Sequence, residues 1–174
     1  MDVEKAIKKR RSIRKYEDKE VPDELVHELL DAARRAPSGN NAQPWKFRVF
    51  KTKEEKELLK ENGIFKQDFV YSAPVIILCC GDPRSYPEHK IDEMDDKNKL
   101  RAVRDLAFAT ENIVLRATEL GLGTCYIGWM DKDKIKRLFD LPDRYVAPYV
   151  VLVGYPAEES EESSRKSLDE IILG

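Results

Sequence analysis

The sequence contains little cysteine, which excludes a fold held together by disulfides. Cys79 and Cys80 are adjacent within an apolar run, and Cys125 is the third. Successive residues of a strand point to opposite faces of a sheet, so the adjacent pair fits core packing better than a disulfide or a shared metal ion. Free thiols are typical of a reducing compartment, and we expect a cytoplasmic protein.

Long apolar runs, excess basic charge and histidine clusters are also missing. No apolar run approaches the roughly 20 residues that cross a membrane, and the first residues, Met1 to Lys5, lack the apolar core of a signal peptide. The formal net charge of -2 argues against a nucleic-acid partner. His27 has no second His or Cys near it in the sequence, so we expect no metal site. An anionic partner would therefore have to bind through a local basic cluster.

The 174 residues are expected to form one domain, because no repeat, linker or low-complexity block divides them. Apolar segments predict strands at residues 45–50, 74–81, 124–129 and 146–155, the second of them central because it is apolar without alternation. Helical spacing predicts a short first helix that contains residues 3–7 and runs into a basic cluster, and further helices near residues 22–36, 52–62, 101–120 and 131–139. The segment from Asp82 to Lys99 has no clear period, so a loop or short helices are expected there. This alternation predicts an α/β or α+β layered fold.

A basic cluster follows the first predicted helix, in which Val3, Ala6 and Ile7 form the apolar face. Its residues are Lys8-Lys9-Arg10-Arg11-Ser12-Ile13-Arg14. One interpretation is favourable interaction with the helix dipole together with solvation. The other is anion binding. In an extended segment Arg10, Ser12 and Arg14 would project to one side while Ile13 faces the core, and two guanidinium groups with a hydroxyl suit a phosphate.

A polar, proline-bounded loop runs from Ala36 to Trp45. It holds two prolines, one glycine and four side chains that both donate and accept hydrogen bonds, namely Ser38, Asn40, Asn41 and Gln43. A surface turn does not need so many amides, so we interpret it as a stiff loop that grips a flat ligand. Further along, Gly128 follows a predicted strand, where a glycine lets a flat ligand approach the backbone.

Three blocks carry the most specific signature of the chain. They are Arg10-Arg11-Ser12-Ile13-Arg14-Lys15-Tyr16, Pro37-Ser38-Gly39-Asn40-Asn41-Ala42-Gln43-Pro44-Trp45 and Gly121-Leu122-Gly123-Thr124-Cys125-Tyr126-Ile127-Gly128-Trp129. In this order they resemble the nitroreductase family of FMN enzymes, and the resemblance covers nearly the whole chain. It implies an α+β sandwich over residues 1–174, a nitroreductase-like FMN-binding domain with a central, mostly antiparallel sheet flanked by helices. It also implies an interlocked homodimer with FMN at the interface.

The resemblance implies cofactor contacts at matched positions. Arg10, Arg11, Ser12 and Arg14 would hold the FMN phosphate, ribityl chain and pyrimidine edge, and Arg165 or Lys166 would complete the phosphate site. Pro37, Ser38 and Gly39 would cover the isoalloxazine ring of the other subunit, with Asn41 and Gln43 shaping that loop. Backbone groups of Tyr126, Ile127, Gly128 and Trp129 would face the ring near N5. No catalytic residue is assigned, because hydride transfer is the chemistry of the flavin.

The resemblance implies that NADH or NADPH reduces FMN and that a small-molecule acceptor, a nitroaromatic or a quinone, then takes the electrons in a ping-pong cycle. Other flavin chemistry, such as dehalogenation or flavin fragmentation, a non-catalytic flavin carrier and a plain interaction domain remain alternatives. Two departures matter. The segment from Asp82 to Lys99 is shorter than the helical insertion of larger members, and Gly128 stands where some relatives have an acidic residue. The apolar C-terminal residues Leu168, Ile171, Ile172 and Leu173 are expected to dock on a partner.

Overall fold

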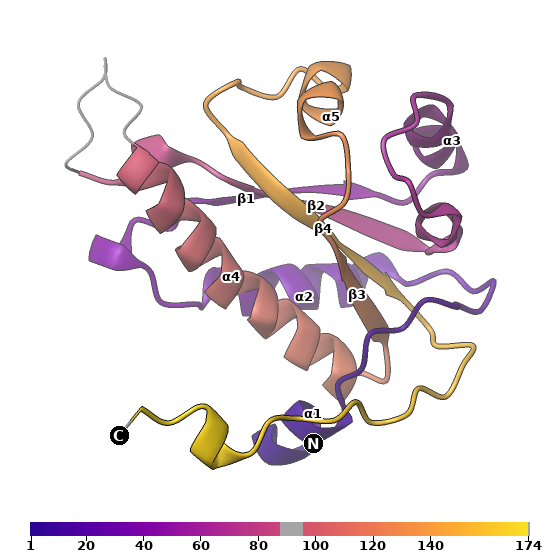
Figure 1. Ribbon diagram of the computed structural model, residues 1–174. Coiled ribbons are helices and arrows are strands. Elements are labelled where there is room, and N and C mark those ends of the chain that lie inside the picture. The colour runs from indigo at the N-terminus through magenta and orange to yellow at the C-terminus, as the bar shows by residue number, and fades with distance from the viewer. Residues whose placement is uncertain (88–95, 174) are drawn as a thin grey trace.

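Four strands form one sheet in the computed structural model, which describes residues 1–87 and 96–173 (Figure 1). The strands are β1 (Trp45–Phe50), β2 (Val75–Gly81), β3 (Gly123–Ile127) and β4 (Val146–Gly154). The helices are α1 (Val3–Lys9), α2 (Asp23–Arg34), α3 (Lys53–Glu61), α4 (Asp96–Glu119) and α5 (Lys132–Leu138). Short 3-10 helices lie at Gly39–Asn41, Asp68–Ser72, Pro83–Ser85 and Leu168–Glu170. The order across the sheet is β1-β2-β4-β3, and each neighbouring pair is antiparallel.

The predicted central strand is confirmed in β2, whose residues are all buried between β1 and β4. Cys79 belongs to the apolar cluster on one face of the sheet and Cys80 to the cluster on the other. The two-residue period of a strand therefore separates the adjacent thiols, as predicted. All three cysteines are free and buried. The cytoplasmic location expected from them stays a prediction.

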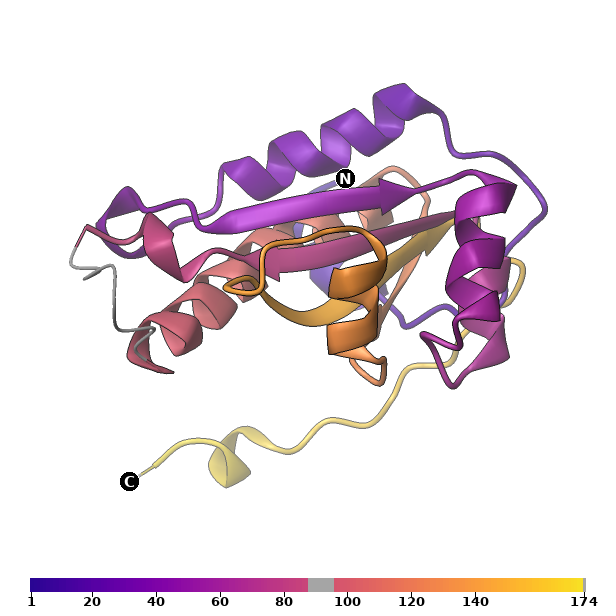
Figure 2. The ribbon, with the colours of Figure 1, turned by 90° about the horizontal axis from the view of Figure 1, so that it is seen from above.

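Helices cover both faces of the sheet (Figure 2). One face packs against α2 and α4 through residues such as Leu29 and Ile113. The opposite face packs against α3 and α5 through Leu59 and Ile135. The α+β sandwich with an antiparallel sheet flanked by helices is therefore confirmed. Among the residues that the structure describes, no helix combines the length and apolar composition needed to cross a membrane.

Strand β4 carries a proline inside a sheet, and an irregularity in the ladder explains how. The β2–β4 register shifts between Cys79, which pairs with Tyr149, and Gly81, which pairs with Val146. Pro148 lies within this irregular stretch, and β3 pairs with β4 only from Val150 onward. Because proline lacks a backbone N–H, such a position costs no ladder hydrogen bond.

Several element boundaries differ from the predictions. Strand β3 ends at Ile127, so the predicted extension to Trp129 is wrong; residues 128–130 turn instead, with the Met130 N–H donating to the Gly128 carbonyl. Helix α4 begins at Asp96 rather than Arg101. Within the segment from Asp82 to Lys99, the expected short helices are seen at Pro83–Ser85 and in the first turn of α4, whereas residues 88–95 lie outside the described part of the chain.

Burial agrees with helical spacing along α4 but not along α1. The spacing of Leu106, Thr110, Ile113, Val114 and Ala117 predicts the apolar stripe of α4, and all five are buried. Ala107, at the same spacing, is exposed, and Asp105 is buried beside the stripe. In α1 only Ala6 is buried, while Val3 and Ile7 are 71% and 58% exposed. Helical spacing correctly places the residues on one face, yet it does not tell whether the same chain covers that face.

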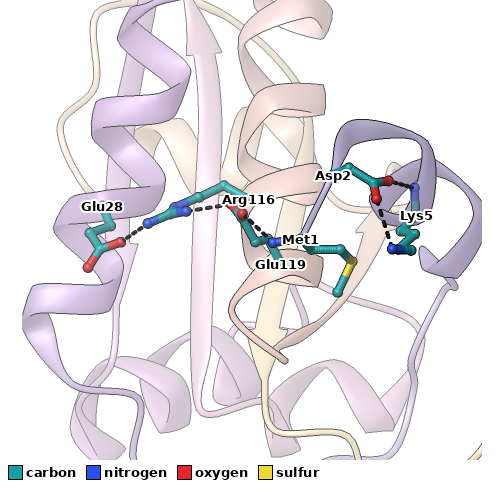
Figure 3. Close-up of polar contacts among 6 residues, drawn as sticks. All are labelled: Met1, Asp2, Lys5, Glu28, Arg116 and Glu119. Atoms are coloured by element: carbon teal, nitrogen blue, oxygen red, sulfur yellow. Dashed lines mark hydrogen bonds and ion pairs between the residues drawn. The ribbon is translucent and has the colours of Figure 1, made fainter.

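Ion pairs fix the C-terminal half of α4 against α2 and the start of the chain (Figure 3). Arg116 lies between Glu28 of α2 and Glu119 of its own helix and pairs with both. Glu119 also accepts from the Met1 amino group at 3.0 Å. Asp2 caps α1 by accepting from the Lys5 N–H at 2.8 Å. These contacts hold α1 at one end of α4, directly before the basic cluster.

The C-terminal tail leaves the body of the domain (Figure 2). Every described residue from 159 onward is exposed. Leu168, Ile171, Ile172 and Leu173 are exposed by 69%, 61%, 63% and 96%. The single chain therefore does not cover the apolar face predicted for this segment.

Candidate functional site

The basic segment is extended and is fixed along the edge strand β3. The Ile13 N–H donates to the Thr124 carbonyl at 2.9 Å, and Ser12 and Thr124 form a parallel bridge. Ile13 is 7% exposed, which confirms that it turns toward the core. The Tyr16 hydroxyl donates to the Ile13 carbonyl at 2.6 Å. Main-chain bonds and one buried side chain thus hold this segment in place.

Gly123 allows this close approach. A Cβ atom at position 123 would lie 2.7 Å from Cγ1 of Ile13 and 2.9 Å from its Cβ. Real Cβ atoms do not come that near, so any side chain here would displace the basic segment from β3.

We expect Gly123→Ala to lower the free energy of unfolding by about 1–3 kcal/mol, the usual cost of overpacking a core. Chemical denaturation measures this change in the free energy of unfolding. Gly128→Ala is the matched control, since a Cβ there would meet only the Pro148 carbonyl oxygen, at 3.7 Å. Equal stability of the two variants would show that Ile13 does not constrain position 123.

Arg10, Ser12 and Arg14 all affect the pKa of the Cys125 thiol. Burial raises the pKa of the Cys125 thiol, while the Arg14 charge, the Ser12 hydroxyl and the Arg10 charge oppose that rise in pKa. All three groups therefore act on the same thiol, and their joint binding of one anion stays a prediction. Within the described part of the chain, neither Arg10 nor Arg14 forms an ion pair, whereas Arg116 does.

Arg11 has a different environment from its neighbours. Its Nη1 donates to the carbonyls of Lys8 and Arg10 at 2.6 and 2.8 Å, and its Nη2 lies 3.4 Å from Glu162. It closes the C-terminal end of α1 and holds the beginning of the tail. A hollow of about 480 Å³ beside it is also lined by Glu158, whose charge would repel a phosphate. Its predicted role in FMN binding stays a prediction.

The polar loop is tightly folded and strained. Asn40, Asn41 and Gln43 have φ values of 54°, 52° and 47°, in the left-handed region that residues other than glycine seldom adopt. The Ser38 Oγ accepts from the Gln43 N–H at 3.0 Å, and the Gln43 side chain donates to the Asn41 carbonyl at 3.2 Å. Pro37, Asn41 and Gln43 are exposed. The expected stiffness is present, and its source is this internal bonding as well as the prolines.

The Gly39 amide ties the loop to α4. It donates at 2.8 Å to Oδ2 of Asp105, a residue that is fully buried. The same oxygen accepts from the Tyr86 hydroxyl at 2.8 Å, and Oδ1 accepts from Nε of Arg104 at 2.8 Å. Asp105 was not predicted as a site residue from the sequence. Its signal was an acidic residue within the apolar stripe of α4, three positions after the buried Ala102.

The third block, residues 121–129, has an exposed backbone at Gly128 and exposed aromatic side chains close to it in the sequence. Tyr126 and Trp129 are 38% and 68% exposed, whereas Ile127 is buried in the core. The Tyr126 ring lies edge-on against Tyr149 at 5.2 Å between centroids. Burial raises the pKa of Tyr149 to about 12, so its hydroxyl stays protonated at neutral pH and can exchange a hydrogen bond with Thr110 at 2.9 Å. The backbone at position 128 is accessible.

One chain keeps the predicted blocks apart. The loop contacts α4 at Asp105, whereas the basic segment lies beyond the end of α4 at Glu119. Fourteen residues of helix rise by about 21 Å at 1.5 Å per residue. Figures 1 and 2 agree that the loop and the basic segment lie at opposite ends of the helix pair α2 and α4. Arg165 and Lys166 lie on the exposed tail, where Arg165 donates only to its own backbone neighbours.

A model of the nitroreductase family matches residues 7–64 and 61–155. The chain belongs to the nitroreductase family. The predicted resemblance is therefore confirmed.

Individual relatives agree with this assignment. A nitroreductase-family protein from Methanothermobacter thermautotrophicus, whose name includes NAD(P)H nitroreductase, is 40% identical over 163 residues, which is 91% of this chain and 79% of the relative. A Bacillus subtilis protein named FMN reductase [NAD(P)H] is 32% identical over 178 residues, 94% of this chain and 70% of its own. A solved nitroreductase family structure from Clostridium difficile 630 has a TM-score of 0.79 at 32% identity and covers 99% of this chain and 97% of its own.

Proposed function

We propose that this nitroreductase-family chain is an FMN-dependent oxidoreductase that takes electrons from NADH or NADPH and passes them to a small-molecule acceptor, such as a nitroaromatic or a quinone. The observation that carries the proposal is the pair of guanidinium groups of Arg10 and Arg14, which have no carboxylate partner in the described chain and lie on one side of a backbone fixed along β3. The names of its relatives support the same class of reaction.

The phosphate end of FMN fits the basic segment. Arg10 and Arg14 supply two positive charges and Ser12 a hydroxyl, and a phosphate dianion binds best to such charge-assisted donors. Ile13 lies between Arg10 and Arg14 in the sequence and is buried in the core. Because it anchors the backbone of this segment, little backbone conformational entropy is lost when a ligand binds there. Arg165 or Lys166 would add a further charge at the phosphate.

The flavin ring fits the open backbone after β3. Gly128 has no side chain to cover its amide, and Tyr126 and Trp129 offer apolar surface on either side. When bound, FMN supplies the hydride chemistry, so the protein needs no acid–base pair of its own.

A complete site of this kind needs two copies of the chain. The loop from Pro37 to Gln43 and the basic segment lie about 21 Å apart along α4, so a second copy is the natural source of the missing wall. The exposed apolar residues of the tail and of α1 supply surface for such a contact. The proposal therefore includes a homodimer in which each flavin touches both subunits.

Anaerobic mixing tests the proposed reaction. The protein saturated with FMN is mixed with NADH and, separately, with NADPH, and the flavin absorbance is followed. We expect bleaching by at least one of them, followed by recovery of the oxidised spectrum when a nitroaromatic or a quinone is added. Free FMN with the same reagents is the control, and the FMN recovered after many turnovers should be chemically intact.

Three outcomes would contradict parts of the proposal. A protein that takes up no FMN is not a flavin enzyme. Bleaching no faster than that of free FMN would indicate a flavin carrier. Loss of intact FMN during turnover, or release of halide from a halogenated substrate as the main reaction, would assign the chain to other flavin chemistry.

A further inference from the structure

Asp105 is a buried carboxylate in the middle of a helix, and its environment needs an explanation. A buried charge is costly unless hydrogen bonds satisfy it. Asp105 accepts three, from the Gly39 amide, the Tyr86 hydroxyl and Nε of Arg104, each at 2.8 Å. Two of these donors come from segments far away in the sequence. The carboxylate thus joins α4, the polar loop and the segment that follows β2.

This carboxylate attaches residues 38–43 of the loop to α4, while the Pro44 carbonyl near the end of the loop accepts from the Asp82 N–H at 2.8 Å. Within the described part of the chain, the other hydrogen bonds of residues 38–43 stay inside the loop, and the bond from Gly39 to Asp105 is the one that leaves it. Position 39 is also closely surrounded. A Cβ there would lie 3.2 Å from Nη2 of Arg104, 3.6 Å from Asp105 and 3.7 Å from the Tyr86 ring.

The anchor holds a backbone that would otherwise relax. Asn40, Asn41 and Gln43 adopt left-handed conformations, and such residues persist only when their surroundings fix them. Burial and the hydrogen bond to Asp105 both raise the pKa of Tyr86, so Tyr86 remains a protonated donor to that carboxylate.

We propose that Asp105 is a positioning residue, which holds the loop from Ser38 to Gln43 in the shape in which it meets the flavin of the partner subunit. The inference rests on the proposed function. Asp105 acts through Gly39 and has no direct contact with the cofactor. An asparagine at this position cannot replace the carboxylate, because it offers one acceptor oxygen and turns an N–H₂ donor toward the donors of the cluster.

The test compares Asp105→Asn with a matched control, Asp82→Asn. Asp82 is also a buried carboxylate, it accepts from the Arg84 amide at 3.0 Å, and it pairs with Arg144 at 3.2 Å, but it does not contact the loop with its side chain. Amide hydrogen exchange of the flavin-free protein and the FMN dissociation constant are measured for both variants. The visible circular dichroism of bound FMN reports the geometry around the ring.

In Asp105→Asn we expect the Gly39 amide to exchange at least about tenfold faster and FMN to bind at least about tenfold more weakly, the effect of one lost charge-assisted bond. The visible dichroism should also change. Asp82→Asn should leave the Gly39 amide, the affinity and the dichroism as in the wild type. Tyr86→Phe, which keeps the carboxylate, should retain the protection of Gly39 and most of the affinity.

The inference fails if Asp105→Asn binds FMN with wild-type affinity and dichroism, even if that variant is less stable. It also fails if the Gly39 amide of the wild type is unprotected, a measurement that needs no variant to fold. If the wild type takes up no FMN, the proposed function fails instead, while the exchange of Gly39 still tells whether Asp105 anchors the loop.

Discussion

Replacing Arg10 and Arg14 together by alanine is expected to weaken FMN binding by about 10²- to 10⁴-fold. Each lost charge-assisted contact costs about 1.5–3 kcal/mol, and 1.4 kcal/mol corresponds to a factor of ten. Among residues 1–87 and 96–173, neither guanidinium group forms an ion pair with a carboxylate, so their removal should leave no buried acid unpaired there and change stability little. Isothermal titration of the flavin-free protein with FMN measures the loss.

Riboflavin makes this experiment specific, because it has the same ring without the phosphate. The wild type should prefer FMN strongly, and the double variant should lose most of that preference. The control is Arg34→Ala with Arg35→Ala, two exposed arginines that pair with Asp31 at the end of α2. A double variant of Arg10 and Arg14 that still discriminates FMN from riboflavin as the wild type does would exclude this segment as the phosphate site.

The second large effect is expected at the C-terminal tail. Ile171→Glu with Ile172→Glu should convert the dimer into monomers and at the same time abolish tight FMN binding. The two side chains are 61% and 63% exposed in the single chain. Burying a residue of this type contributes roughly 1.5–3 kcal/mol, and a carboxylate in the same contact is strongly unfavourable. Sedimentation equilibrium gives the oligomeric state, and flavin fluorescence gives the bound fraction.

Leu58→Glu is the control for this experiment. Leu58 is a 38% exposed apolar residue on α3, the helix that covers the face of the sheet opposite to α2 and α4. It should leave the dimer and the flavin content unchanged. A tail variant that remains dimeric, or a wild type that binds FMN as a monomer, would refute the expected role of the tail and the sharing of the site.

Local rules predicted much of this fold because local physics decides it. The period of two placed Cys79 and Cys80 on opposite faces of β2, and the run without alternation identified β2 as central. The helix expected near residues 52–62 begins directly after Thr52, whose side chain caps it by accepting from the Glu55 N–H. In these cases the neighbouring residues alone determine the outcome.

Prediction failed where the outcome depends on distant contacts. Asp105 was overlooked because its partners come from residues 39 and 86, which helical periodicity cannot reveal. Val3, Ala6 and Ile7 share one face of α1 as their spacing predicts, yet Val3 and Ile7 are exposed in the part of the chain that the structure describes. The assignments of individual residues to FMN remain predictions. They depend on which side chains lie close together in the folded protein, and local sequence patterns do not reveal this.

The length of α4 decides which cofactor site of a dimer a substitution in one subunit would impair. In a dimer built as proposed, α4 separates the arginines of one cofactor site from the loop that serves the other. A defective loop would then impair the flavin held by its healthy neighbour. Conversely, two differently defective chains, one without the arginines and one without the anchored loop, would together assemble one complete site and one empty one. Mixed dimers of this kind would keep half of their activity, although neither parent has any.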